Sequence, residues 1–124
     1  MNLTPEQARK KLVEALRSGE YTQKDRALRV REGYCCLGVA CDVYRKIEEP
    51  GEHWHPVKAR GVWEFMGEAG SLPYKVMTWL GFATSGGNLE GKYGSLVDMN
   101  DSGKSFEYIA DAIEAGEVKL KEAP

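Results

Sequence analysis

Residues 99–110, MNDSGKSFEYIA, combine residue types that bind anions with the start of a helical pattern. Gly103-Lys104-Ser105 are the last three residues of a phosphate-binding P-loop. A complete P-loop also needs a glycine five residues before Gly103, and that position is Asp98. The sequence therefore argues against a P-loop NTPase.

Two interpretations of this segment stay open. Ser102 or Ser105 is an ordinary helix N-cap, and the residues before it have ordinary turn chemistry. Alternatively, the free amides and positive dipole end of the helix, with Lys104 beside them, hold a phosphate. We expect Asn100 and Asp101 to contact a ribose or a base, and the other candidates of the segment to contact phosphate. The candidates are Asn100, Asp101, Ser102, Gly103, Lys104 and Ser105.

Arginines on a predicted hairpin provide a second set of anion ligands. Residues 27–31, ALRVR, alternate apolar and basic residues, as a half-buried strand does, and 34–37 predict its return strand. Arg29 and Arg31 then share the face opposite Leu28 and Val30. Such a face is either solvated or a surface for oxyanions, because guanidinium groups bind them bidentately. We include Arg26 and Arg29 among the candidate ligand contacts.

Aromatic residues provide the third part of a possible nucleotide site. Trp79 and Phe82 lie at the end of a predicted helix, beside the glycine-rich residues 84–94, which we expect to form a mobile loop of the kind that often closes over ligands. Stacking of a base on an aromatic ring is worth ~1–3 kcal/mol. Trp79 and Phe82 are therefore the candidate adenine contacts, whereas Trp54 and Trp63 are expected in the core or in a lid.

The sequence offers neither a catalytic dyad nor a metal-ligand pattern. Three cysteines, Cys35, Cys36 and Cys41, lack the Cys-x-x-Cys spacing of a zinc site and are expected to be free, buried thiols. Neither His53 nor His55 is close in sequence to a plausible nucleophile. We expect no enzyme activity, no metal and no cofactor.

The elements predict a single α+β domain over residues 1–124, with a small antiparallel sheet or hairpins packed on about four helices. The first helix begins with a Thr4-Pro5-Glu6-Gln7 capping box and ends at Ser18-Gly19. The other expected elements are helices over 38–47, 73–80 and 105–115, a strand over 62–66 and an extended run over 95–99.

Composition excludes several classes of function. The 124 residues include 42% hydrophobic and 29% charged residues with a net charge of -2, which argues against general nucleic-acid binding. A helix-turn-helix interpretation is disfavoured, because residues 117–124 are too few for a recognition helix after the last predicted helix, and that helix would have to come from elsewhere. No apolar stretch is long enough for a membrane helix and no secretory signal opens the chain, so we expect a cytoplasmic protein without a membrane partner.

Six motifs occur in an order that resembles a family of small proteins encoded mainly by phages and prophages. They are Ala15-Leu16-Arg17-Ser18-Gly19, Tyr21-x-Gln23, Leu28-Arg29, Tyr34-Cys35-Cys36-Leu37-Gly38-Val39-x-Cys41-Asp42, Leu72-Pro73-x-x-Val76-x-x-Trp79-Leu80-Gly81 and Met99-Asn100-Asp101-x-Gly103-x-Ser105-Phe106-x-x-Ile109-Ala110.

Within that group, the chain is similar to the Thoeris anti-defence sponge proteins of phages. The resemblance implies binding, without cleavage, of cyclic nucleotide immune signals: cyclic ADP-ribose isomers and, for some members, cyclic di- or trinucleotides. It also implies a symmetric homo-oligomer, such as a dimer or a hexamer, with sites between protomers. The candidate residues above are chemical assignments and are not carried over from that family. Rival hypotheses are a module that binds a host protein, a DNA-binding accessory protein and an enzyme that degrades the signal.

Overall fold

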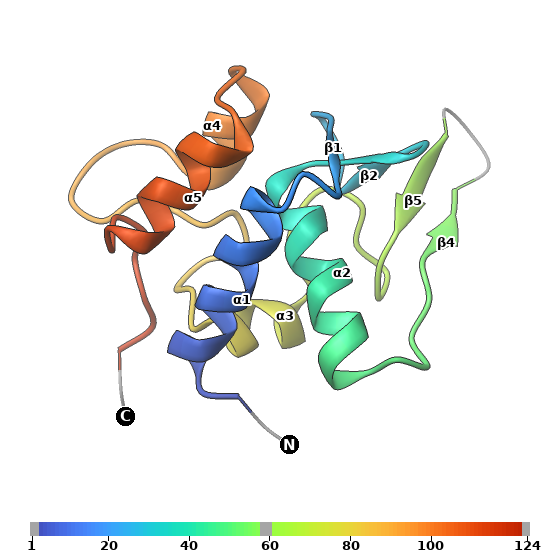
Figure 1. Cartoon of the computed structure of the whole chain (residues 1–124), viewed down its shortest axis with the longest axis horizontal. Helices are drawn as coiled ribbons and strands as arrows, with labels where there is room; N and C mark the ends of the chain where they lie inside the picture. Colours follow the sequence, from blue (N-terminus) through green and yellow to red (C-terminus); the bar gives the residue numbers. More distant parts are fainter. Residues whose placement is uncertain (1–2, 58–60, 123–124) are drawn as a thin grey trace.

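The computed structural model describes residues 3–57 and 61–122, which form five helices and a five-stranded sheet in an α+β arrangement, as predicted. The helices are α1 (Pro5–Arg17), α2 (Cys36–Glu48), α3 (Tyr74–Leu80), α4 (Leu96–Asp101) and α5 (Phe106–Glu114). The strands are β1 (Thr22–Gln23), β2 (Arg29–Val30), β3 (Gly33–Tyr34), β4 (His55–Pro56) and β5 (Val62–Glu64). Strands β4 and β5 lie at one end of the molecule and α5 at the other, with α1 and α2 between them (Figure 1).

The sheet has the order β1-β3-β2-β5-β4. Strands β2 and β3 form the predicted hairpin, and β5 and β4 extend it in antiparallel fashion. Strand β1 pairs with β3 in parallel, so the sheet is mixed rather than purely antiparallel. The parallel pair arises because β1 precedes β2 in sequence and joins the far side of β3 instead of forming a hairpin of its own.

Helix α1 begins as predicted. The Thr4 hydroxyl accepts from the Gln7 amide at 3.2 Å, and the Gln7 side chain accepts from the Thr4 amide at 2.9 Å. This reciprocal pair satisfies two backbone donors that a helix start leaves free. The apolar face of α1, including Leu12 and Leu16, packs against both α2 and α5 and forms the centre of the core.

Helix α2 begins earlier than its sequence pattern indicates. Cys35 and Cys36 were expected on the return strand, but Cys35 is the N-cap of α2 and Cys36 is its first residue. The start of α2 lies so close to Leu28 that a Cβ added to Gly38 would be 1.8 Å from the Leu28 carbonyl oxygen. The prediction was wrong because this contact between α2 and the residue before β2 is tertiary and leaves no periodic signal in the sequence.

The C-terminal third contains one more helix than predicted. Residues 95–99 were expected to be extended, but Ser95 is an N-cap whose hydroxyl accepts from the Asp98 amide at 3.1 Å, and α4 follows. The glycine-rich segment before α4 is anchored by backbone bonds from Leu89 to Gly94 and from Leu96 to Gly87. No helix within residues 3–57 and 61–122 is both long and apolar enough to cross a bilayer.

Candidate functional site

A row of side chains crosses the sheet from edge to edge. The pairing registers place Gln23 opposite Tyr34, Tyr34 opposite Arg29, Arg29 opposite Trp63, and Trp63 opposite Pro56. Directly paired residues project to the same face of a sheet, so these five side chains form one continuous line. We call Tyr34, Arg29 and Trp63, the middle of this line, the aromatic row.

Arg29 is held among aromatic rings. Its guanidinium carbon lies 4.3 Å from the Trp63 ring centroid, 5.2 Å from that of Tyr34 and 5.6 Å from that of Trp54. Its Nε donates to the Arg31 carbonyl at 3.3 Å, and within residues 3–57 and 61–122 no carboxylate lies within 4.0 Å of it. A guanidinium stacked on rings in this way keeps its outer N–H groups available for an oxyanion.

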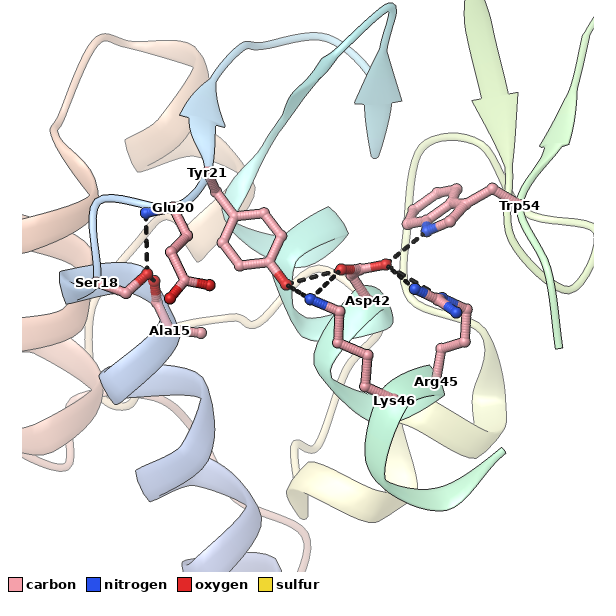
Figure 2. A network of polar contacts seen from close by, with 8 residues as sticks. All are labelled: Ala15, Ser18, Glu20, Tyr21, Asp42, Arg45, Lys46 and Trp54. Carbon is pink, nitrogen blue, oxygen red and sulfur yellow. Dashed lines mark hydrogen bonds and ion pairs between the residues drawn. The ribbon is translucent and has the colours of Figure 1, made fainter. Parts of the chain in front are cut away.

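A buried carboxylate, Asp42 of α2, lies between Tyr21 and Trp54, as Figure 2 shows, and both of these rings pack on Tyr34 of the aromatic row. Asp42 is 4% exposed and accepts hydrogen bonds from the Tyr21 hydroxyl at 2.7 Å and the Trp54 indole at 3.1 Å. Arg45 Nη2 lies 3.1 Å and Lys46 Nζ 3.3 Å from its carboxylate oxygens. Asp42 thereby fixes two aromatic side chains and two cations at once.

The protonation states in this network follow from burial and hydrogen bonding. Burial by itself raises the pKa of Asp42, but the bonds from Tyr21 and Trp54 and the charges of Lys46 and Arg45 outweigh it, so the pKa lies below its ordinary value. Burial and the bond to Asp42 raise the pKa of Tyr21 well above its ordinary value. The carboxylate therefore stays charged and the phenol neutral, with Arg45 and Lys46 both paired to the one anion.

The aromatic row continues into the rings around it. Trp54 lies 5.7 Å from Tyr34 and 5.1 Å from the fully buried Phe65, and Tyr21 lies 5.0 Å from Tyr34, edge to face. These contacts hold the ring planes in place, because off-centre ring pairs add stability beyond their buried area. The result is a rigid, partly exposed surface of rings and cations.

Sequence reasoning missed the rings of this surface. Trp54 and Trp63 were assigned to a core or a lid, and Tyr34 was assigned only to the hairpin. The available signal was that Arg29, Tyr34 and Trp63 all lie in short strands, where a shared face brings them together. The pairing of β5 with β2, however, joins segments about 30 residues apart and could not be deduced from local patterns. Arg31, expected beside Arg29, lies in the turn at φ 54° and its side chain passes over Gly61.

The segment 100–105 lies next to the β1 edge of the sheet, but its polar groups are largely occupied by hydrogen bonds within the chain. The Gln23 side chain donates to Asn100 Oδ1 at 2.9 Å and to the Lys104 carbonyl at 2.8 Å. Asn100 also accepts from the Cys36 amide at 3.1 Å and donates to the Lys24 carbonyl at 2.7 Å, and it is 3% exposed. Asn100 therefore joins β1, α2 and α4, and its assignment as a ligand contact is corrected.

The other candidates of this segment serve mainly as caps. Ser105 is the N-cap of α5 and accepts from the Tyr108 amide at 3.1 Å, which confirms the capping interpretation. Ser102 donates to the Met99 carbonyl at 3.1 Å, and the Gly103 amide donates to the Asn100 carbonyl at 3.2 Å.

Two of the predicted cations lie near the β1 edge of the sheet. Asp101 accepts from the Arg26 amide at 3.1 Å, which places these two exposed residues side by side. The Lys104 ammonium lies 4.9 Å from the Tyr108 ring centroid and is exposed. Of the candidates in and around the segment, only the side chains of Arg26 and Lys104 present positive charge to a ligand.

Trp79 and Phe82 do not join the aromatic row. Phe82 is fully buried and has no ring face open to a base, so its assignment as a stacking residue is corrected. Trp79 lies against the C-terminal end of α2, where its indole donates to Glu48 at 2.9 Å and its ring packs on Tyr44. The predicted adenine contacts are therefore separated from the predicted phosphate contacts.

A cavity of about 690 Å³ lies between α1 and the end of α5 together with the residues that follow it. Its floor is apolar, with Val13, Ile113 and Val118, and its rim carries both signs of charge. None of the sequence-predicted ligand contacts lines it. The Arg17 guanidinium on this rim is already bonded to Glu107, Asp111 and Glu114 of α5.

The described residues contain no group of three or more histidine, cysteine or acidic side chains that could hold a metal ion. The three cysteines are free and buried. Burial raises the pKa of Cys35 to about 11 and raises the pKa of Cys36 and of Cys41 well above the ordinary value of a thiol. These thiols are protonated at neutral pH and are therefore weak nucleophiles and weak metal ligands.

Comparisons with known proteins identify the chain only at the level of a family. No curated protein and no solved structure matches it. A family model described as a domain of unknown function, DUF8296, matches residues 4–117. The chain belongs to the DUF8296 family.

Proposed function

We propose that the protein is a non-catalytic sponge that binds and sequesters a cyclic nucleotide signal, with the aromatic row as its ligand surface. The observation that carries the proposal is the Arg29 guanidinium, which lies over the rings of Trp63 and Tyr34 and has no carboxylate within 4.0 Å among residues 3–57 and 61–122. Phosphate oxygens bind the outer N–H edge of Arg29, and a base stacks on the exposed ring surface beside it. Arg26 and Lys104, at the β1 side of the sheet, supply further positive charge.

The charge distribution supports a small anionic ligand rather than a nucleic acid. A protein that binds a polynucleotide neutralises several phosphates along an extended basic surface, whereas this chain has a net charge of -2. In the aromatic row, the positive charge of Arg29 is not offset by any carboxylate within 4.0 Å among the described residues. One or two phosphates and one or two bases match this surface, as in a cyclic ADP-ribose isomer or a cyclic di- or trinucleotide.

The absence of cleavage is part of the proposal. The pKa of Tyr21 is raised by burial and by its bond to Asp42, so the phenol is a poor base at neutral pH. Asp42 is occupied by four donors and cannot easily activate a water molecule. The groups closest to the row thus act as supports, and sequestration needs only charge, stacking and exclusion of water.

The open position of the aromatic row favours a site completed by a second protomer. Arg29, Tyr34, Trp54 and Trp63 are all half-buried on one sheet face. Tight binding of a small ligand usually buries most of its surface. A symmetric homo-oligomer, a dimer or a hexamer, supplies the missing wall, in line with the resemblance to phage sponges, and places the protein in the cytoplasm of the infected host.

A release assay tests the proposal. Protein is mixed with cyclic ADP-ribose isomers and cyclic di- and trinucleotides, separated from free ligand and heat-denatured, and the released molecule is identified by mass spectrometry. Wild type is expected to release intact ligand. Arg29→Gln is expected to release a smaller amount of ligand, by roughly tenfold or more. Lys119→Gln, which removes one exposed charge from the C-terminal segment, is the matched control and should equal wild type.

Two outcomes would contradict the proposal. Release of a chemically changed nucleotide would indicate an enzyme that degrades the signal. If wild type retains no nucleotide, even at nucleotide concentrations well above those of a cellular signal, the result would favour a module that binds a host protein.

A further inference from the structure

A second pocket, of about 420 Å³, lies where α3 meets the C-terminal end of α2. Pockets of this size accommodate small organic ligands. Its lining is dominated by three aromatic residues and one carboxylate. The lining residues are Leu3, Tyr44, Glu48, Tyr74, Lys75, Thr78 and Trp79.

The rings of this pocket are arranged as walls. The Tyr44 and Trp79 rings have centroids 5.4 Å apart and planes at 78° to each other. The bond from the Trp79 indole to Glu48, at 2.9 Å, fixes the orientation of the larger ring. Tyr74 is 68% exposed and contributes a third ring at the mouth. A cation of the chain already lies at this ring, because Lys121 Nζ is 5.1 Å from its centroid and donates to its hydroxyl at 3.2 Å.

The electrostatics of the pocket favour a positive ligand. Glu48 ends α2, where the helix dipole is negative, and no cation lies within 4.0 Å of its carboxylate among the described residues. Lys75 lies 3.6 Å from the Glu49 carboxylate, so these two charges offset each other. One uncompensated carboxylate therefore remains beside the ring faces. A phosphate would be repelled here, which separates this pocket from the aromatic row.

We propose that this pocket binds a small organic cation of the quaternary or methylated ammonium class, with Trp79, Tyr44 and Tyr74 around the cation and Glu48 as its counter-charge. Ring faces carry negative potential and attract a poorly hydrated cation, whereas a compact, strongly hydrated ammonium gains less. The site does not depend on the proposed nucleotide function. It gives Trp79 a role different from adenine stacking.

The test uses tetramethylammonium and choline as probes and the neutral choline isostere 3,3-dimethylbutanol as the matched control ligand. Binding is followed by the NMR resonance of the Trp79 indole N–H, assigned by comparison with Trp79→Phe. The expected result is a saturable shift with both cations and binding of the neutral isostere weaker by roughly fivefold or more. An equal response to cation and isostere, or no saturable shift with either cation, would overturn the proposal.

Two surface variants give responses of opposite sign. Glu48→Gln removes the counter-charge and should weaken cation binding severalfold, whereas Lys75→Gln frees Glu49 and should tighten it. Lys75 is exposed, and Glu48 is half-buried but keeps an acceptor for the Trp79 indole when it is replaced by Gln, so the fold should survive, and amide spectra outside the pocket check this. Equal affinities in wild type and both variants would contradict a charge-selective site.

Discussion

Asp42 and Arg17 are the centres of two charge clusters with opposite construction. Asp42 is one buried anion surrounded by the donors Tyr21, Trp54, Arg45 and Lys46, beside the aromatic row. Arg17 is one exposed cation surrounded by three carboxylates of α5, at 2.6–3.2 Å. Hydrogen bonds to these carboxylates, first of all Glu114, raise the pKa of Arg17 above its ordinary value.

The difference shows which cluster the fold depends on. Water replaces a lost partner at an exposed pair, so such pairs contribute little and are screened by salt. A buried charge has no such replacement, and removing one partner leaves the others unsatisfied. The Arg17 cluster therefore joins α1 to α5 only weakly, whereas the Asp42 cluster holds the rings that support the aromatic row.

Replacement of Asp42 should have the largest effect on stability. Asp42→Ala leaves the Tyr21 hydroxyl, the Trp54 indole and two cations without their shared acceptor, and we expect a loss of about 3 kcal/mol. Urea denaturation followed by circular dichroism measures it. Asp111→Ala, which removes an exposed aspartate of the Arg17 cluster, is the matched control and should change little. Equal losses in the two variants would contradict the comparison.

Acid should remove the contribution of the Asp42 carboxylate to the free energy of unfolding. The pKa of Asp42 is lower in the folded chain than in the unfolded one, so its stabilisation is present above the unfolded pKa of about 4 and is lost as pH falls through the folded pKa. The difference in unfolding free energy between wild type and Asp42→Asn should be constant from about pH 5 to 8 and shrink below about pH 4. A difference that persists unchanged to about pH 2 would mean that ionisation of Asp42 is not its source.

Replacement of Arg17 should have the smallest effect on stability. Arg17→Gln should lower the thermal midpoint slightly in low-salt buffer, because three carboxylates of α5 then repel one another. In about 1 M NaCl, where the screening length is only about 3 Å, wild type and variant should coincide. A large, salt-independent loss would show that this cluster, and not only that of Asp42, holds the fold together.

The sequence predicted elements wherever their signals are local. The Thr4 capping box, the Ser105 cap and the Gly81 stop at the end of α3, with φ 73°, each lie within a few residues of the helix end that they specify. The early start of α2 was missed because it depends on the approach of Gly38 to Leu28.

The site was less predictable because its contacts are distant in sequence. Asn100 has the residue type of a ligand contact, yet its partners Gln23, Lys24 and Cys36 are 64–77 positions away and engage its side-chain oxygen twice and its side-chain nitrogen once. Arg29 was identified from the alternation of its strand. The ring from β5 that stacks on it depends on strand pairing, and local periodicity does not specify strand pairing.

Calorimetric titration of the retained cyclic nucleotide into two tryptophan variants tests the central claim most directly. Trp63 belongs to the aromatic row, and Trp79 to the pocket beside α2. The account predicts that Trp63→Leu weakens binding by roughly tenfold or more, because a base loses its stacking surface, while Trp79→Leu binds as wild type. Full affinity in Trp63→Leu together with loss in Trp79→Leu would contradict the account and place the nucleotide in the other pocket.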